Sequence, residues 1–247
     1  MEYTSTIWII SIAAAVMIGM SKTGVSGLGT LVVPLMAFAF GGMPSSGMVL
    51  PMLIMADVFG VIYYHRSANR KLLLILLPWA LVGLIIGLIV GKRISAEQFR
   101  QLIAILILFS IVIMLWQEFR KKHDKPTTVH SKSVAAFFGI TGGFSTMIGN
   151  AAGPVMSVYL LSRQLPKTAY IGTTAWFFFI INITKLPLQI WVWHNITIQS
   201  LLFNLSLLPA IAIGAYAGIK ITAIIPENTY RWFVIVITVI ASVALFF

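Results

Sequence analysis

Apolar residues form long runs along this chain, and short polar breaks separate the runs. Two uncharged stretches, between Lys22 and Asp57 and between Lys185 and Lys220, each exceed the roughly 20 residues that a helix needs to cross the hydrocarbon core of a bilayer. Each stretch must therefore contain turns as well as helices. We predict an all-α integral membrane protein with apolar segments at residues 5–20, 28–41, 47–64, 72–91, 99–117, 134–149, 150–161, 168–190, 197–219 and 230–247.

The composition supports membrane insertion and narrows the choice of function. Of the 247 residues, 59% are hydrophobic and 9% are charged, which is too few charges for the surface of a soluble domain. Lys and Arg total 17 against 6 Asp and Glu, but they lie mainly in the short breaks and do not form the basic face of a nucleic-acid-binding protein. The absence of cysteine excludes disulfides, thiolate metal sites and cysteine nucleophiles. No basic region precedes the first apolar run, so we expect a retained helix and not a cleaved signal peptide.

The two halves of the chain resemble each other. A shift of 120 residues aligns glycines and prolines of the first half with those of the second, namely Gly19 with Gly139, Gly29 with Gly149 and Pro34 with Pro154. Gly and Pro fix helix breaks, kinks and close packing, so their preserved order indicates a structural repeat. We predict a first membrane repeat at residues 1–118, a basic linker at 119–133 and a second membrane repeat at 134–247.

The positions of Lys and Arg predict how each half is oriented. Each half opens with two short apolar arms, which either form a hairpin that returns to its own side or make one crossing. The hairpin arrangement puts 12 Lys and Arg on one side of the membrane and 3 on the other, whereas the single crossing divides the same loops 8 against 7. Cytoplasmic loops carry the excess of Lys and Arg, which favours the hairpin. We therefore predict two inverted-topology repeats in the cytoplasmic (inner) membrane, each a broken or re-entrant hairpin followed by three transmembrane helices, with the N-terminus outside and the linker 119–133 cytoplasmic.

The two hairpin tips, Gly19–Gly29 and Gly139–Asn150, are rich in Gly, Ser and Thr. Backbone that is not helical is tolerated at membrane depth only where it is buried in protein or lines a wet cavity. Entering from opposite faces, the tips would meet near the midplane. The half-helices that follow, from near Thr30 and near Asn150, would each present an N-terminus that favours an anion. The alternative is that these glycines only allow close helix packing, as we expect for Gly83 and Gly87.

With these features the sequence resembles the sulfite exporter TauE/SafE family, also called the 4-toluene sulfonate uptake permease family. The resemblance rests on Gly19–Pro34 (GMSKTGVSGLGTLVVP), its counterpart Gly139–Pro154, the basic break His65–Lys71 and the duplicated layout. It covers essentially the whole chain. The resemblance implies a transporter of sulfite, sulfonates or related small anions.

Three ionisable residues, Lys22, Asp57 and Lys185, fall within apolar segments. Each costs about 2.5–3.5 kcal/mol at mid-bilayer on insertion scales, so each needs a partner, a ligand or a route to water. We predict that Lys22 counters the charge of an anion, and that Asp57 either carries a coupling proton or holds Lys22 in an ion pair. Lys185 either extends to the membrane interface or belongs to the pathway, together with Asn182, which lies one turn earlier. None of these charges is repeated in the other half, which suits a single asymmetric ligand.

We predict a secondary transporter that moves a small anion (sulfite, a sulfonate or a small carboxylate) by alternating access, with its site between the hairpin tips. The predicted binding residues are Lys22, Thr23, Ser26, Gly29, Thr30, Thr146, Gly149 and Asn150. The partners would be the anion, the lipid bilayer and a coupling proton or sodium ion. No catalytic residue, metal site, cofactor or nucleic acid is predicted, and the anion, the direction of transport and the oligomeric state stay open.

Three other functions compete with a carrier. An anion channel would present rings of like groups, whereas the internal charges here are single. An intramembrane serine protease is suggested by Gly24-Val-Ser-Gly27, but the four histidines fall at segment ends or in the linker, which is poor geometry for activating Ser26. A membrane-anchored scaffold has soluble parts too short to bind a large partner.

Overall fold

The computed structural model describes residues 4–95, 98, 101, 105, 112, 132–226, 229–230 and 232–236. Every element in these residues is a helix, which confirms the prediction of an all-helical chain. Four helices in this part of the chain are long and apolar enough to cross a membrane, and a bent pair forms one further candidate span. Most of the predicted linker 119–133 and most of the segments 99–117 and 230–247 lie outside the described residues.

The first half contributes four described helices: α1 Ser5–Lys22, α2 Leu28–Phe40, α3 Gly42–Tyr64 and α4 Arg70–Gly91. Side-chain caps begin two of them, since the Thr4 hydroxyl accepts from the backbone N–H of Ile7 and the Asn69 amide oxygen accepts from that of Leu72. Pro51 and Pro78 lie inside α3 and α4. The predicted bounds of these helices are close to those observed, except that α3 begins five residues before the predicted residue 47.

The second half contributes α6 Lys132–Gly149, α7 Gly153–Ser162, α8 Lys167–Trp191, α9 Ile198–Ser206 and α10 Leu208–Ile224. The apolar segment predicted over 197–219 forms two helices, α9 and α10, which meet at a bend of 49°. Pro209 lies in the first turn of α10 and has no N–H to continue the ladder of α9. The half-helix predicted to begin near Asn150 begins at Gly153.

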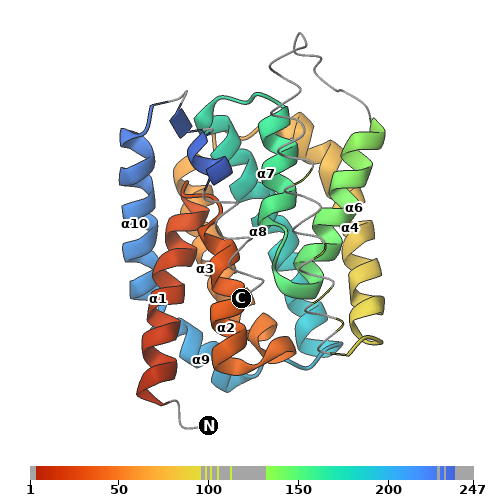
Figure 1. Cartoon of the computed structure of the whole chain (residues 1–247), viewed down its shortest axis with the longest axis vertical. Coiled ribbons are helices and arrows are strands. Elements are labelled where there is room, and N and C mark those ends of the chain that lie inside the picture. Colours follow the sequence, from red (N-terminus) through yellow and green to blue (C-terminus); the bar gives the residue numbers. More distant parts are fainter. Residues whose placement is uncertain are drawn as a thin grey trace.

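Two hairpins enter the molecule from opposite ends (Figure 1). Helix α1 begins at the lower end, near the N-terminus, and the connection from α2 to α3 lies at that same end. Helix α6 begins at the upper end, and the connection from α7 to α8 lies there as well. The break within each hairpin is therefore held inside the molecule.

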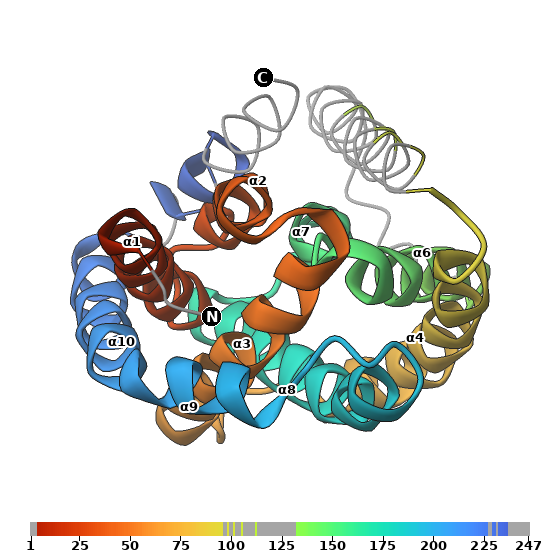
Figure 2. The same ribbon diagram turned by 90° about the horizontal axis from the view of Figure 1, so that it is seen from below.

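The central helices α3 and α8 lie between two packed pairs, α1 with α10 on one side and α6 with α4 on the other (Figure 2). Glycines allow each pair to approach closely. A Cβ at Gly19 would overlap the carbonyl oxygen of Ile211 on α10, and one at Gly143 would overlap that of Ala80 on α4. This packing holds the hairpins against the central helices and so positions both breaks.

Candidate functional site

The first break, residues 23–27 between α1 and α2, depends on two glycines with positive φ. Gly24 has a φ of 139° and Gly27 a φ of 101°, in backbone regions that residues with a Cβ rarely adopt. Gly27 is also the N-cap of α2, where its carbonyl accepts from the backbone N–H of Thr30. The sequence therefore ends α1 at Lys22 and starts a new helix within the interior of the protein.

The second break, residues 150–152 between α6 and α7, depends on Asn150. Its φ of 56° is left-handed, a conformation that Asn tolerates better than most residues. The N–H of Asn150 bonds to the Thr146 carbonyl and that of Ala151 to the Ser145 carbonyl, which closes the end of α6. Pro154, in the first turn of α7, has no N–H and suits a helix start.

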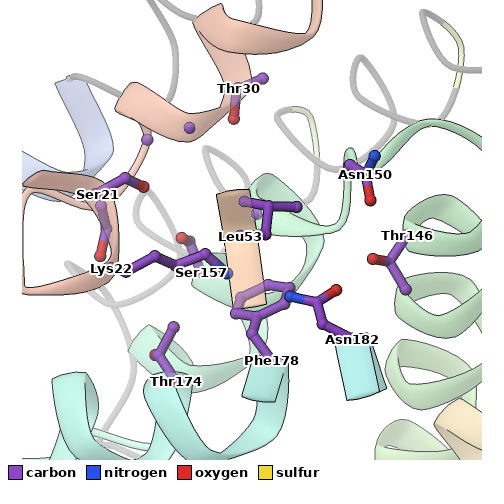
Figure 3. Close-up of a pocket in the computed structure, with 14 residues that line it drawn as sticks. Ser21, Lys22, Thr30, Leu53, Thr146, Asn150, Ser157, Thr174, Phe178 and Asn182 are labelled. Atoms are coloured by element: carbon purple, nitrogen blue, oxygen red, sulfur yellow. The ribbon is translucent and has the colours of Figure 1, made fainter. Parts of the chain in front are cut away.

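Both breaks line one pocket (Figure 3). The first turns of α2 and α7 face it through Gly29, Thr30 and Gly153. Its free volume is about 50 Å³, enough for a few waters or one small ion. The complete lining is Ser21, Lys22, Ser26, Gly27, Gly29, Thr30, Leu53, Thr146, Asn150, Gly153, Ser157, Thr174, Phe178 and Asn182. Helix N-termini, hydroxyls and one ammonium give this lining the character of an anion site.

Lys22 and Asp57 form an ion pair beside the pocket. The Lys22 Nζ lies 2.8 Å from Asp57 Oδ1, and the side chains are 9% and 0% exposed. The other carboxylate oxygen, Oδ2, accepts from the Asn182 amide at 2.6 Å. The Lys22 ammonium also lies over the Phe178 ring, 4.1 Å from its centroid. The internal lysine is thus held by α3 and α8 at the end of α1, in contact with the pocket.

Lys185 is buried among oxygen atoms of the second break and does not extend to the membrane interface. Its Nζ donates to the Thr146 carbonyl at 2.8 Å, the Thr146 hydroxyl at 3.0 Å and the Asn150 amide oxygen at 2.6 Å, with the Asn182 amide oxygen at 3.4 Å. Of the two interpretations of Lys185 from sequence, extension to the interface is therefore excluded. The side chain joins α8 to the end of α6.

Hydrogen bonds that Ser46, near the start of α3, accepts from two amides complete the connection between the halves. The Asn150 amide donates to the Ser46 carbonyl at 3.2 Å and to its hydroxyl at 3.3 Å. The Gln189 amide donates to the same hydroxyl at 3.2 Å. The second break is therefore tied to α3 as well as to α8.

The residues predicted from sequence to bind the anion fall in two groups. Most of them line the pocket: Lys22, Ser26, Gly29, Thr30, Thr146 and Asn150. Thr23 and Gly149 are buried but are not part of the lining. The Thr23 hydroxyl instead bonds to the Gly19 and Ala215 carbonyls at 3.0 and 2.9 Å, which holds α1 against α10.

Sequence reasoning identified Asn182 and Lys185 on α8 but missed Thr174 and Gln189 of the same helix. Pocket and network residues recur along this helix at spacings of four, four, three and four, namely Thr174, Phe178, Asn182, Lys185 and Gln189. Such spacing puts them on one helix face. The spacing of these residues can be read from the sequence, but a search for charged residues alone does not find it. Ser46 gave no such signal.

Comparison with models of known protein families identifies a family for this chain. A family model described as Sulfite exporter TauE/SafE matches residues 11–245. The chain belongs to the sulfite exporter TauE/SafE family. Membership implies that this TauE/SafE protein is a multi-pass membrane transporter of sulfite or related anions. Proteins of this family are transporters rather than enzymes. Neither the curated proteins nor the solved structures gave a match to this TauE/SafE chain.

Proposed function

We propose that the protein is a secondary transporter that moves one small anion by alternating access, with the anion bound in the pocket between the two breaks. The observation that carries this proposal is the lining itself, in which the first turns of α2 and α7 and the Lys22 ammonium meet. Helix N-termini and an ammonium both stabilise negative charge. Sulfite, a sulfonate or a small carboxylate fits this chemistry.

The charges around the pocket support an anionic ligand. Among the described residues, Lys22 and Lys185 contribute two positive charges and Asp57 contributes one negative charge to the buried network. A buried charge without a counter-charge is costly, so the remaining positive charge favours entry of an anion. An ammonium has three N–H donors, and its ion-pair contact with the single oxygen Asp57 Oδ1 leaves donors for a ligand.

Alternating access is supported by the way in which the halves exchange partners. The first helix of one half, α1, packs on α10 of the other, while the first helix of the second half, α6, packs on α4 of the first. The hairpins also enter from opposite ends (Figure 1). This exchange is what two inverted repeats would produce, and such repeats permit one half to move against the other around a central site.

We propose that the protein lies in the inner membrane. The end of the molecule that is uppermost in Figure 1 would face the cytoplasm. The basic breaks at residues 65–71 and 162–167 lie at that end, whereas the break that follows α4, which contains Lys92 and Arg93, lies at the lower end. An excess of Lys and Arg is typical of the cytoplasmic side. The N-terminus would then lie outside.

For Asp57, the 2.8 Å contact supports the role of holding Lys22 over the role of carrying a coupling proton. A carboxylate in this position keeps the ammonium at the pocket when no anion is bound. On binding, the anion shares the Lys22 ammonium with Asp57.

The test is a thermal-shift screen of the purified protein with sulfite, sulfate, thiosulfate, taurine, sulfoacetate and small carboxylates. A bound anion stabilises the folded state by mass action, so at least one should raise the melting temperature in a saturable manner. The same anion should then enter proteoliposomes with saturable kinetics, whereas ohmic conductance would indicate a channel. Lys22→Ala should lose both effects. Lys220→Ala removes a similar charge from the exposed end of α10 and is the matched control.

A further inference from the structure

The Lys185 ammonium occupies a cage of oxygen atoms at the second break. The cage comprises the Thr146 carbonyl, the Thr146 hydroxyl and the amide oxygens of Asn150 and Asn182, at 2.6–3.4 Å from Nζ. The lysine is 0% exposed. Among the described residues, no carboxylate forms an ion pair with it. The positive charge is thus stabilised by neutral oxygen ligands.

The orientations of both amides are fixed by their other contacts. The Asn182 amide nitrogen donates to the Asp57 carboxylate, and the Asn150 amide nitrogen donates to the Ser46 carbonyl. Both of these partners can only accept, so each amide must turn its oxygen toward Lys185. Together with the Thr146 carbonyl, three oxygens that cannot donate surround Nζ. Three acceptors around Nζ match the three hydrogens of an ammonium, whereas a neutral amine has only two.

The donor set is also that of a monovalent metal-ion site. Helix α6 ends at Gly149, and the partial negative charge of its C-terminal end favours a cation near the Thr146 carbonyl. Transporters with broken helices hold coupling sodium ions with carbonyl oxygens of unwound backbone and helix C-termini. Hard cations prefer such carbonyl, amide and hydroxyl oxygens. In this protein the ammonium of α8 lies where such an ion would bind.

We propose that Lys185 is a tethered cation that replaces a coupling sodium ion, so that anion transport requires no sodium. The covalent link keeps the charge in the cage through the whole transport cycle. It also positions the Asn182 amide, which bridges to Asp57 and through it to Lys22. Removal of the lysine side chain would leave the oxygen cage free to bind sodium. The transport part of this proposal rests on the proposed function, whereas the cage is argued from contacts alone.

The first experiment measures melting temperatures of purified protein in sodium chloride and in choline chloride at equal ionic strength, without added substrate anion. The wild type should melt at the same temperature in both salts. Lys185→Ala should be destabilised and should regain several degrees with sodium in a saturable manner. Lys185→Met is the matched control, because its side chain removes the charge but fills the cage, and sodium should not stabilise it. A folded Lys185→Ala protein without a sodium response, or an equal response of Lys185→Met, would overturn the proposal.

The second experiment uses wild-type proteoliposomes and therefore does not depend on the folding of a variant. Anion uptake should be the same, within about twofold, with sodium or choline outside. A tenfold or larger stimulation by sodium would reject the tethered-cation role while leaving anion transport itself established. Failure of every tested anion to bind or enter would count against the proposed function, and the sodium response of Lys185→Ala would then decide the cage separately.

Discussion

The Lys22 ammonium and the Asp57 carboxylate meet at 2.8 Å, where the end of α1 reaches the C-terminal half of α3. This contact ties a break in the backbone to a helix that passes through the centre of the molecule. Asp57 is the only carboxylate among the described buried side chains. It lies beside the pocket but is not part of the lining. Changes to either residue should therefore affect both stability and anion binding, and the two effects can be separated.

Lys22→Ala should abolish anion flux and anion-induced stabilisation, because the variant removes the ammonium that faces the pocket. It should also lower the free energy of unfolding by about 3–5 kcal/mol, since Asp57 is left as a buried unpaired charge. The double variant Lys22→Ala/Asp57→Asn should recover much of this stability without recovering transport. The check combines flux in proteoliposomes with denaturation of all three proteins. Recovery of flux in the double variant would show that Lys22 does not contact the anion.

Asp57→Asn tests whether the carboxylate holds Lys22 or carries a proton. If it holds Lys22, the variant should lower flux at least tenfold at every pH, because the ammonium is no longer fixed at the pocket. If it carries a proton, the wild type should respond to an imposed pH gradient, and the variant should transport without that response. Flux measured with and without the gradient distinguishes the two roles. The ion pair predicts the first result.

Asn182→Leu should destabilise the protein by about 1–3 kcal/mol, because the substitution leaves one Asp57 oxygen without its hydrogen bond. It should also weaken anion binding, since Asn182 lines the pocket. Thr174→Val is a suitable comparison from the same face of α8. The Thr174 hydroxyl bonds only to the Tyr170 carbonyl of its own helix among the contacts described, so its loss should change stability less. Equal losses in the two variants would show that the bridge to Asp57 contributes little.

The sequence predicted the helical architecture well because Gly, Pro and apolar runs act locally. Helix ends at Lys22 and Gly149 follow from the Gly-rich breaks. The bend between α9 and α10 lies within one predicted apolar segment, and Pro209 marks it. The inverted repeat and the orientation in the membrane stay predictions.

The site could be predicted only in part. Lys22, Asp57 and Lys185 were evident as charges within apolar segments, and an ion pair with Lys22 was one of the two roles predicted for Asp57. The contacts of Lys185 with Thr146 and Asn150 were not predicted. Asp57 lies 35 residues from Lys22 in the sequence, and the backbone between them includes the irregular break, so no helical period relates the two positions. The contact between Lys185 and the second break likewise depends on how α8 packs against α6. Tertiary packing, and not local pattern, determines these pairs.

The last prediction concerns the close packing of α4 and α6, which holds the second hairpin in place. Gly143→Ala should destabilise the protein by about 1–3 kcal/mol or more, because the new Cβ would overlap the Ala80 carbonyl, which is rigid backbone. The neighbouring substitution Gly142→Ala is the matched control. Its Cβ would meet the Met156 sulfur at 3.0 Å, and a flexible thioether can move aside. Thermal denaturation of both variants should therefore show a large loss for Gly143→Ala and a small one for Gly142→Ala. Similar losses would mean that helix separation at Ala80 does not govern stability, and that the two helices tolerate a wider spacing than this packing implies.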